Sequence, residues 1–168
     1  MNYANIKSHD IANGPGVRVS LFVSGCTHHC KDCFNQEAWD FDYGKPFDQS
    51  VIDHILDLLA PTYIKGITYL GGEPLDPRNQ AGLLDLSRQI KAKYPEKSIW
   101  CFTGYVWERL PQVPDVTDEL LSYCDVLVDG PFVAEKKNLS LRFRGSENQR
   151  LIDVPKTLDA TDVVLWEE

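Results

Sequence analysis

Four short apolar runs, each closely followed by a glycine, most constrain the fold of this chain of 168 residues. They are residues 17–23, 67–70, 98–103 and 125–128, and the glycines are Gly25, Gly71, Gly104 and Gly130. Between the runs lie segments with apolar residues at helical spacing. Alternating strands and helices favour a mostly parallel sheet with crossover helices. We therefore predict one α/β domain over residues 1–168.

The predicted helices carry start and stop signals. Asp48 is expected to cap a helix through about residue 59, because a carboxylate at this position accepts a backbone N–H of the first turn. A second helix is predicted over about 79–94 and ends before Pro95. A short third helix begins at Thr117 or Asp118. Residues 163–166 are expected to form a late strand.

Charge and hydropathy argue against two classes of partner. The formal net charge of −8 argues against general nucleic-acid binding. No stretch approaches the roughly 18 consecutive apolar residues that cross a membrane, and polar residues such as Lys7 and Asp10 interrupt any leader after Met1. We therefore expect a cytoplasmic protein. Residues 136–156 differ from the rest, with six basic and two acidic side chains, and are a candidate for docking a partner.

Three cysteines directly after the first run form a C-x3-C-x2-C motif: Cys26, Cys30 and Cys33. Structural zinc sites normally take four protein ligands, and a cubane iron–sulfur cluster has four irons. Three clustered thiolates therefore suggest a 4Fe–4S cluster with one iron left for an outside molecule.

A zinc site is the alternative for these cysteines, completed by His28, His29, Cys101 or Cys124. A disulfide framework is less favoured, because five cysteines is an odd number and the cytosol is reducing. We expect Cys101 and Cys124 to be small buried residues on or beside strands.

The cysteine motif and Gly71-Gly72-Glu73-Pro74, which follows the second run, together resemble the signatures of the radical S-adenosylmethionine enzymes. The resemblance implies a small, incomplete (βα)6-type barrel. It also implies that the glycine-rich stretch contacts the amino group of S-adenosylmethionine. Glycines permit close backbone approach to a ligand, and Glu73 offers a charge-assisted hydrogen bond to an ammonium group.

The resemblance extends less completely to other ligand contacts. Many of these enzymes carry an aromatic residue before the third cysteine, whereas this chain has Asp32 there and Phe34 after it. Adenine contacts are therefore expected from the backbone of Asp32, Cys33 and Phe34. Asp129 follows the fourth run and is a further candidate contact, although the lysine of the "DxK" pair found in some relatives is missing.

Two further motifs narrow the resemblance. Residues 13–18, NGPGVR, are similar to a stretch in activases of glycyl radical enzymes, and residues 144–149, RGSENQ, resemble a segment of the activating proteins of anaerobic ribonucleoside-triphosphate reductases. Residues 44–47, 103–105 and 126–130 also match those activating proteins, so the resemblance spans residues 1 to about 153.

This resemblance implies a reaction and its partners. A reduced cluster cleaves S-adenosylmethionine, and the 5′-deoxyadenosyl radical takes hydrogen from a glycine of the catalytic subunit of the reductase. An external donor, such as a flavodoxin or a thiol system, supplies the electron. Two alternatives stay open: an activase of another glycyl radical enzyme such as pyruvate formate-lyase, and a non-catalytic zinc-binding interaction module.

Overall fold

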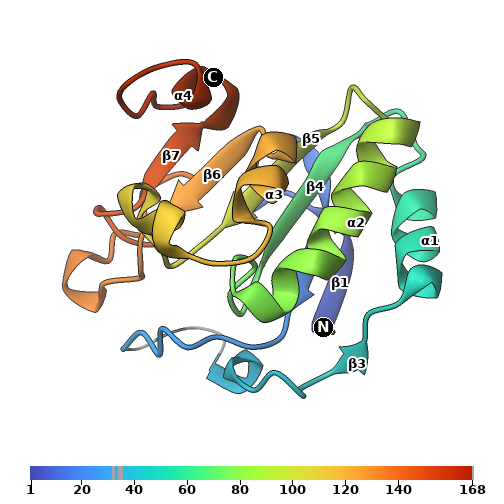
Figure 1. The fold of residues 1–168 in the computed structure, drawn as a ribbon, viewed down its shortest axis with the longest axis horizontal. Helices are drawn as coiled ribbons and strands as arrows, with labels where there is room; N and C mark the ends of the chain where they lie inside the picture. Colours follow the sequence, from blue (N-terminus) through green and yellow to red (C-terminus); the bar gives the residue numbers. More distant parts are fainter. Residues whose placement is uncertain (32, 34–35, 168) are drawn as a thin grey trace.

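The computed structural model describes residues 1–31, 33 and 36–167, and its centre is an open seven-stranded sheet in the order β3-β1-β2-β4-β5-β6-β7 (Figure 1). The strands are β1 (Asn2–Asp10), β2 (Val17–Val23), β3 (Lys45–Pro46), β4 (Ile64–Gly71), β5 (Ser98–Phe102), β6 (Val126–Asp129) and β7 (Arg150–Asp153). Strands β2, β4, β5 and β6 pair in parallel at the centre, and β1, β3 and β7 join antiparallel.

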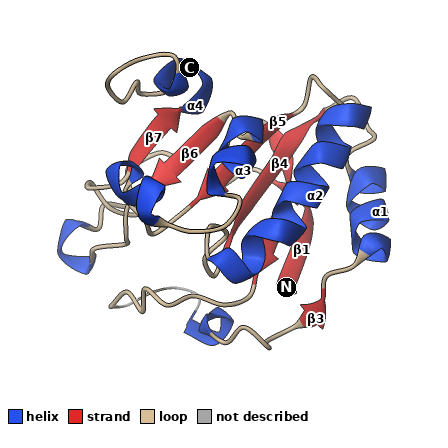
Figure 2. Cartoon of the chain, viewed as in Figure 1, coloured by secondary structure: helices blue, strands red, loops and turns tan. Residues whose placement is uncertain are grey.

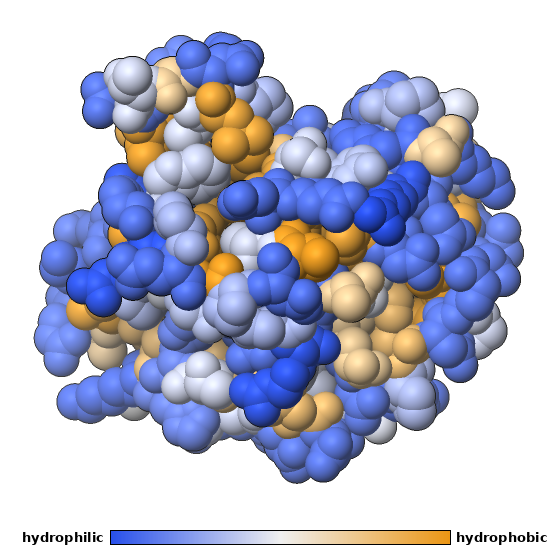
Figure 3. Space-filling view, viewed as in Figure 1, coloured by the Kyte–Doolittle hydropathy of each residue, from blue (hydrophilic) through white to orange (hydrophobic). Residues whose placement is uncertain are grey.

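The helices are α1 (Gln49–Leu58), α2 (Pro77–Lys93), α3 (Thr117–Tyr123) and α4 (Val154–Leu158), with short 3-10 turns η1 (Gln36–Trp39), η2 (Trp107–Gln112) and η3 (Ala134–Lys136). Helices α1, α2 and α3 cover one face of the sheet (Figure 2). On this side the surface is mostly hydrophilic, with smaller hydrophobic patches (Figure 3). No helix in the described part of the chain is long and apolar enough to cross a membrane.

The main core lies between the sheet and these three helices. Alternate side chains of β2, including Val19 and Leu21, are fully buried there against apolar residues of the helices such as Ile55 and Leu83. This follows from the period of two in a strand and from the apolar stripe of each helix.

The opposite face of the sheet carries a smaller apolar cluster. Trp100 of β5 and Val128 of β6 are buried there and are covered by Phe143 and Trp166. The ring centroids of Trp100 and Trp166 lie 4.9 Å apart in an edge-on arrangement. The carboxyl-terminal segment, whose role the sequence did not reveal, therefore covers part of this open face.

The four predicted strands that precede glycines and the three predicted helices are confirmed, with shifted ends. Asp48 caps α1, because its side chain accepts the backbone N–H of Val51. Helix α2 begins two residues earlier than predicted, since Asp76 caps it and Pro77 suits the first turn. The α/β class and the mostly parallel sheet are also confirmed.

The predicted late strand over residues 163–166 is wrong. Within the described residues this segment forms no strand. It makes one isolated bridge to β7, between Leu165 and Ile152, with backbone hydrogen bonds from Asp153 to Val164 and from Trp166 to Leu151 on either side. Strand β1 was not predicted, because its exposed residues are polar and its partly buried ones are mixed. It pairs instead with β2 from Tyr3 to Asp10, with two register shifts.

Arg18 stabilises the sheet near the start of β2. Its side chain is 1% exposed and donates to the hydroxyls of Thr68 and Ser98 and to the carbonyls of Ile67 and Ser98. The Thr68 hydroxyl donates in turn to the Asn13 carbonyl. Burial lowers the pKa of Arg18 to about 10, although the charge of Asp125 opposes this. One guanidinium thus joins β2, β4, β5 and the NGPG loop.

Replacing Arg18 with leucine is expected to lower the free energy of unfolding by about 3 kcal/mol, because several buried oxygens lose their donor. Urea denaturation monitored by circular dichroism measures this change. Arg88→Leu is the control, since Arg88 is about half exposed and pairs with an exposed Glu119. We expect this variant to lose much less stability, because an ion pair between exposed side chains contributes little. Equal losses in the two variants would contradict the role given to Arg18.

Candidate functional site

The loops that follow the parallel strands meet at one end of the sheet. The cysteine loop follows β2 and runs beneath the carboxyl ends of the strands (Figure 1). It shares a cavity of about 170 Å³ with residues that follow β4, β5 and β6. The lining includes Cys26, Cys30, Cys33, Gly71, Gly72, Glu73, Gly104 and Gly130. The two motifs that the sequence singled out thus lie at one site, as expected for loops after parallel strands.

The three clustered cysteines differ from the other two. Cys26, Cys30 and Cys33 are partly exposed, whereas Cys101 and Cys124 are buried in the core, as predicted. Burial is the main cause that raises the pKa of Cys26 to about 11, and it also raises the pKa of Cys30. Without a metal, the Cys26 and Cys30 thiols therefore hold their protons at neutral pH, and a metal must displace these protons.

Within the described residues, no group of three or more His, Cys, Asp or Glu side chains is placed to hold a single metal ion. The core positions of Cys101 and Cys124 remove two of the candidates to complete a zinc site. A cluster differs from a single ion because each thiolate binds a different iron, so the ligands surround a larger body. The core positions of Cys101 and Cys124 therefore count against a zinc site that either of them would complete.

The segment after the cysteine loop holds the loop in place. The Cys26 N–H donates to the Trp39 carbonyl at 3.1 Å. Gly25 has a φ of +99°, and a Cβ there would lie 1.9 Å from the Phe41 ring, so only glycine fits. The rings of His29 and Trp39 stack with centroids 4.3 Å apart. Residues 36–41 thus fix both the start and the middle of the cysteine loop.

Gly71 and Gly72 pack against the chain that leads into the cysteine loop. A Cβ on Gly72 would lie 2.5 Å from the Gly25 carbonyl oxygen, and one on Gly71 would lie 2.8 Å from the Val23 backbone. The N–H groups of Gly72 and Glu73 donate to the carbonyls of Val23 and Gly25 at 2.8 and 2.7 Å. We predicted that a ligand would closely approach the backbone of these glycines. In the described structure, the groups that lie against them are the backbone atoms of Val23 and Gly25.

Glu73 is the most heavily bonded side chain of the site. It is 1% exposed. Its Oε1 accepts from His28 Nε2 at 2.6 Å and from the Gly104 N–H at 2.7 Å. Its Oε2 accepts from the Thr103 hydroxyl at 2.7 Å and from the Leu75 N–H at 2.9 Å. These donors fill the roughly four acceptor positions of a carboxylate.

The sequence did not identify His28 as a partner of Glu73, because only the fold brings them together. The His28 ring meets the edge of Tyr105, with centroids 4.6 Å apart, and faces Gly104, which has no side chain. Burial lowers the pKa of His28, but the hydrogen bond and charge of Glu73 outweigh this effect and raise it above the ordinary value.

Asp129 lies at the end of β6 and is 1% exposed. Its carboxylate accepts from the Arg150 guanidinium and from the Trp107 N–H, and Arg150 also pairs with Glu108. These bonds raise the pKa of Arg150 above its ordinary value. Asp129 does not line the cavity, whereas its neighbour Gly130 does.

The remaining predicted contacts have different positions. Pro74 is buried and is not part of the cavity lining. Cys33 lines both this cavity and a neighbouring one of about 420 Å³. Asp32 and Phe34 lie outside the described residues.

The RGSENQ segment lies beside the cysteines in space. The Gln149 side chain lines both neighbouring cavities, and its Oε1 accepts the N–H groups of Gly145 and Ser146. Its amide nitrogen donates to the Gly130 carbonyl. Arg144 donates to the Gln149 carbonyl and so folds the segment onto itself.

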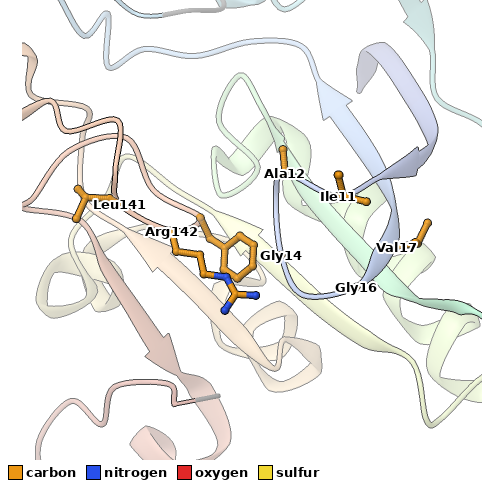
Figure 4. Close-up of a pocket in the computed structure, with 8 residues that line it drawn as sticks. Ile11, Ala12, Gly14, Gly16, Val17, Leu141 and Arg142 are labelled. Carbon is orange, nitrogen blue, oxygen red and sulfur yellow. The ribbon is translucent and has the colours of Figure 1, made fainter.

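A third cavity, of about 510 Å³, lies between the NGPG loop and residues 141–143. In Figure 4, Arg142 lies between Leu141 and the loop that carries Gly14. This cavity and the 420 Å³ cavity share Ala12, Leu141 and Phe143 as lining residues. The NGPG loop and the segment around residues 141–149, from opposite ends of the chain, therefore line neighbouring cavities on the same face of the sheet.

One buried donor of the site has no partner. The indole N–H of Trp39 makes no hydrogen bond within the described part of the chain, although its nitrogen is buried. Trp39 lines the cavity that contains the three cysteines. A buried donor without a partner is costly, so this residue fits a site that takes a group with hydrogen-bond acceptors.

The chain is similar to proteins of known family. Residues 12–152 match the model of a 4Fe-4S single cluster domain. Three relatives are named anaerobic ribonucleoside-triphosphate reductase-activating protein. The one from Pasteurella multocida is 45% identical over 89% of this chain and 95% of its own length. The one from Enterobacteria phage T4 is 42% identical over 90% and 93%, and the one from Escherichia coli K12 is 43% identical over 89% and 96%.

Gly104→Ala is expected to destabilise the protein by about 1–3 kcal/mol, because the new Cβ would lie 2.6 Å from the His28 ring and force it to move. Gly82→Ala is the matched control. Gly82 lies within α2, and its Cβ would lie 3.1 Å from the flexible end of Met1 and in ordinary contact with the Phe47 ring, at 3.5 Å. Alanine there should stabilise the helix by about 0.5–1 kcal/mol. Urea denaturation measures the free energy of unfolding of both variants. An unchanged value for Gly104→Ala would contradict the described contact.

Proposed function

The chain belongs to the family of anaerobic ribonucleoside-triphosphate reductase-activating proteins, and on that premise we propose that it is a radical S-adenosylmethionine enzyme that forms a glycyl radical on the catalytic subunit of such a reductase. The observation that carries the proposal is the shared cavity of the three cysteines and the glycine-rich segment.

Cys26, Cys30 and Cys33 would each hold one iron of a 4Fe–4S cluster. Their thiols are accessible from the cavity, and the unpartnered Trp39 N–H offers a donor to cluster or ligand atoms. When bound and reduced, the cluster supplies the electron that splits S-adenosylmethionine into methionine and a 5′-deoxyadenosyl radical, which takes a Cα hydrogen from a glycine of the partner. The protein positions these groups and excludes water.

The amino end of S-adenosylmethionine would lie beside Gly71, Gly72 and Glu73, with Pro74 fixing the turn behind them. Its adenine end would lie near Cys33, where we also expect Asp32 and Phe34. The bonds of Asp129 to Arg150 and Trp107 favour an indirect role for that carboxylate, through the position of the β6 end.

We further propose that the whole chain is one radical S-adenosylmethionine domain and that the sheet is its small, incomplete barrel. The face opposite the helices would be the barrel interior. The apolar side chains of Leu70, Phe102 and Phe132 line its cavities and can keep water from a radical. The electron comes from an external donor, such as a flavodoxin or a thiol system, because the remaining cysteines are buried.

The partner would reach the site along the open face. We propose that Arg142 takes part in docking because of its position. It lines the 510 Å³ cavity on this face, where its guanidinium lies over the Phe143 ring, and exposed Leu139 lies close to it in sequence. Two other arginines of the predicted stretch bond to residues of the site itself, Arg150 to Asp129 and Arg144 to Gln149.

Cys30→Ala should abolish S-adenosylmethionine cleavage and lower bound iron after anaerobic reconstitution. Cys101→Ala is the control, since it removes a thiol from the core and should keep both properties. Iron analysis measures the bound metal, and an assay of 5′-deoxyadenosine measures cleavage. Electron paramagnetic resonance with and without S-adenosylmethionine shows whether the ligand alters the reduced cluster. A wild-type protein that holds zinc and releases no 5′-deoxyadenosine would overturn the proposed function and favour the zinc module.

Arg142→Glu is expected to weaken activation of the reductase about tenfold at low salt and to change 5′-deoxyadenosine formation without partner little, because a rim charge acts mainly on association. Lys93→Glu is the control, with the same charge change at an exposed position of α2, outside the predicted docking stretch. Glycyl radical yield against partner concentration measures the effect. Unchanged activation in Arg142→Glu would refute this docking assignment. Activation of pyruvate formate-lyase instead would identify the alternative partner.

A further inference from the structure

The Glu73 carboxylate has no acceptor position left for a ligand. Its four donors come from His28, Leu75, Thr103 and Gly104. A carboxylate accepts about four such bonds. An ammonium group can therefore bind Glu73 only if one of the present donors leaves.

The four donors are not equally free to leave. Two of them are backbone N–H groups, of Leu75 and Gly104, whose positions follow from the ends of β4 and β5. The Thr103 hydroxyl is buried and also accepts the Tyr105 N–H. His28 differs because it is a side chain, is 18% exposed and lines the cavity.

A buried carboxylate needs compensation in every state of the site, because an uncompensated buried charge is strongly destabilising. His28 and an ammonium group both donate an N–H from a group that can carry positive charge. One can therefore replace the other at Oε1 without leaving Glu73 short of a donor. No proton has to be transferred in this exchange.

We propose that His28 is a positioning residue that occupies the ammonium position on Glu73 in the ligand-free protein and that S-adenosylmethionine displaces it. This inference rests on the proposed function and deepens it. His28 lies between Cys26 and Cys30 in the sequence. Ligand binding is thereby coupled to the position of the cysteine loop.

The experiment compares the affinities of reconstituted wild type, His28→Ala and His28→Gln for two ligands that are not cleaved. S-adenosylhomocysteine carries the ammonium group, and 5′-methylthioadenosine lacks the amino acid part. Dissociation constants come from calorimetry and are normalised to bound iron.

His28→Ala is expected to bind S-adenosylhomocysteine roughly fivefold to tenfold more tightly, because its competitor for Glu73 is gone. Its affinity for 5′-methylthioadenosine should stay unchanged. The His28→Gln side chain has an amide donor that restores the competition, so this variant should bind close to wild type.

Weaker or unchanged binding of S-adenosylhomocysteine by His28→Ala overturns the proposal, as does equal tightening for both ligands. His29→Asn is the control for disturbance of the loop, because His29 stacks on Trp39, is not bonded to Glu73, and has a left-handed backbone that asparagine tolerates. If His28→Ala cannot be reconstituted, a His28→Gln that binds tenfold more weakly than wild type also overturns the proposal.

Different results would contradict the proposed function and the exchange at Glu73. A wild-type protein with full iron that binds neither S-adenosylhomocysteine nor S-adenosylmethionine contradicts the proposed function itself. A wild-type protein that binds them, together with a His28→Ala variant that binds S-adenosylhomocysteine no more tightly than wild type, contradicts only the exchange at Glu73.

Discussion

The buried carboxylate of Glu73 is the interaction on which the site depends. Its donors belong to the cysteine loop, to the segment after β4 and to the end of β5. These segments are far apart in the sequence, and the pairing of β2, β4 and β5 brings them to the same end of the sheet. Because a buried charge is strongly unfavourable without partners, the carboxylate holds them together as a set. The Glu73 N–H adds a bond to Gly25, at the start of the cysteine loop.

The two faces of the sheet have different roles around this site. One face packs against α1, α2 and α3 and forms the main core. The other face is only partly covered, by Phe143 and Trp166, and the three cavities line it or its end. Arg18 joins three strands on this second face, where its guanidinium lies over the Trp100 ring, near the end opposite the cysteines. The loops of the site follow the other ends of these strands, on the side of the cysteines.

Much of this could be predicted from local sequence. Glycines after apolar runs marked the strand ends, and Asp48 marked a helix start, since both signals act within a few residues. Strand β1 escaped prediction because pairing with β2, and not its own composition, makes it a strand. The partners of Glu73 and Asp129 also escaped, because His28 and Arg150 meet them only in the folded chain. Sequence could indicate that these carboxylates matter, but not which donors they would have.

The same contacts change how the glycine-rich motif is interpreted. Gly71 and Gly72 lack side chains because the backbone of Val23 and Gly25 lies against them, so their identity is required before any ligand binds. A substitution at these positions disturbs the root of the cysteine loop and would reduce ligand binding indirectly. Loss of activity there cannot separate a scaffold role from a ligand contact. His28 is better suited to that distinction, because its bond to Glu73 is the one member of the set that a ligand ammonium can replace without moving the backbone.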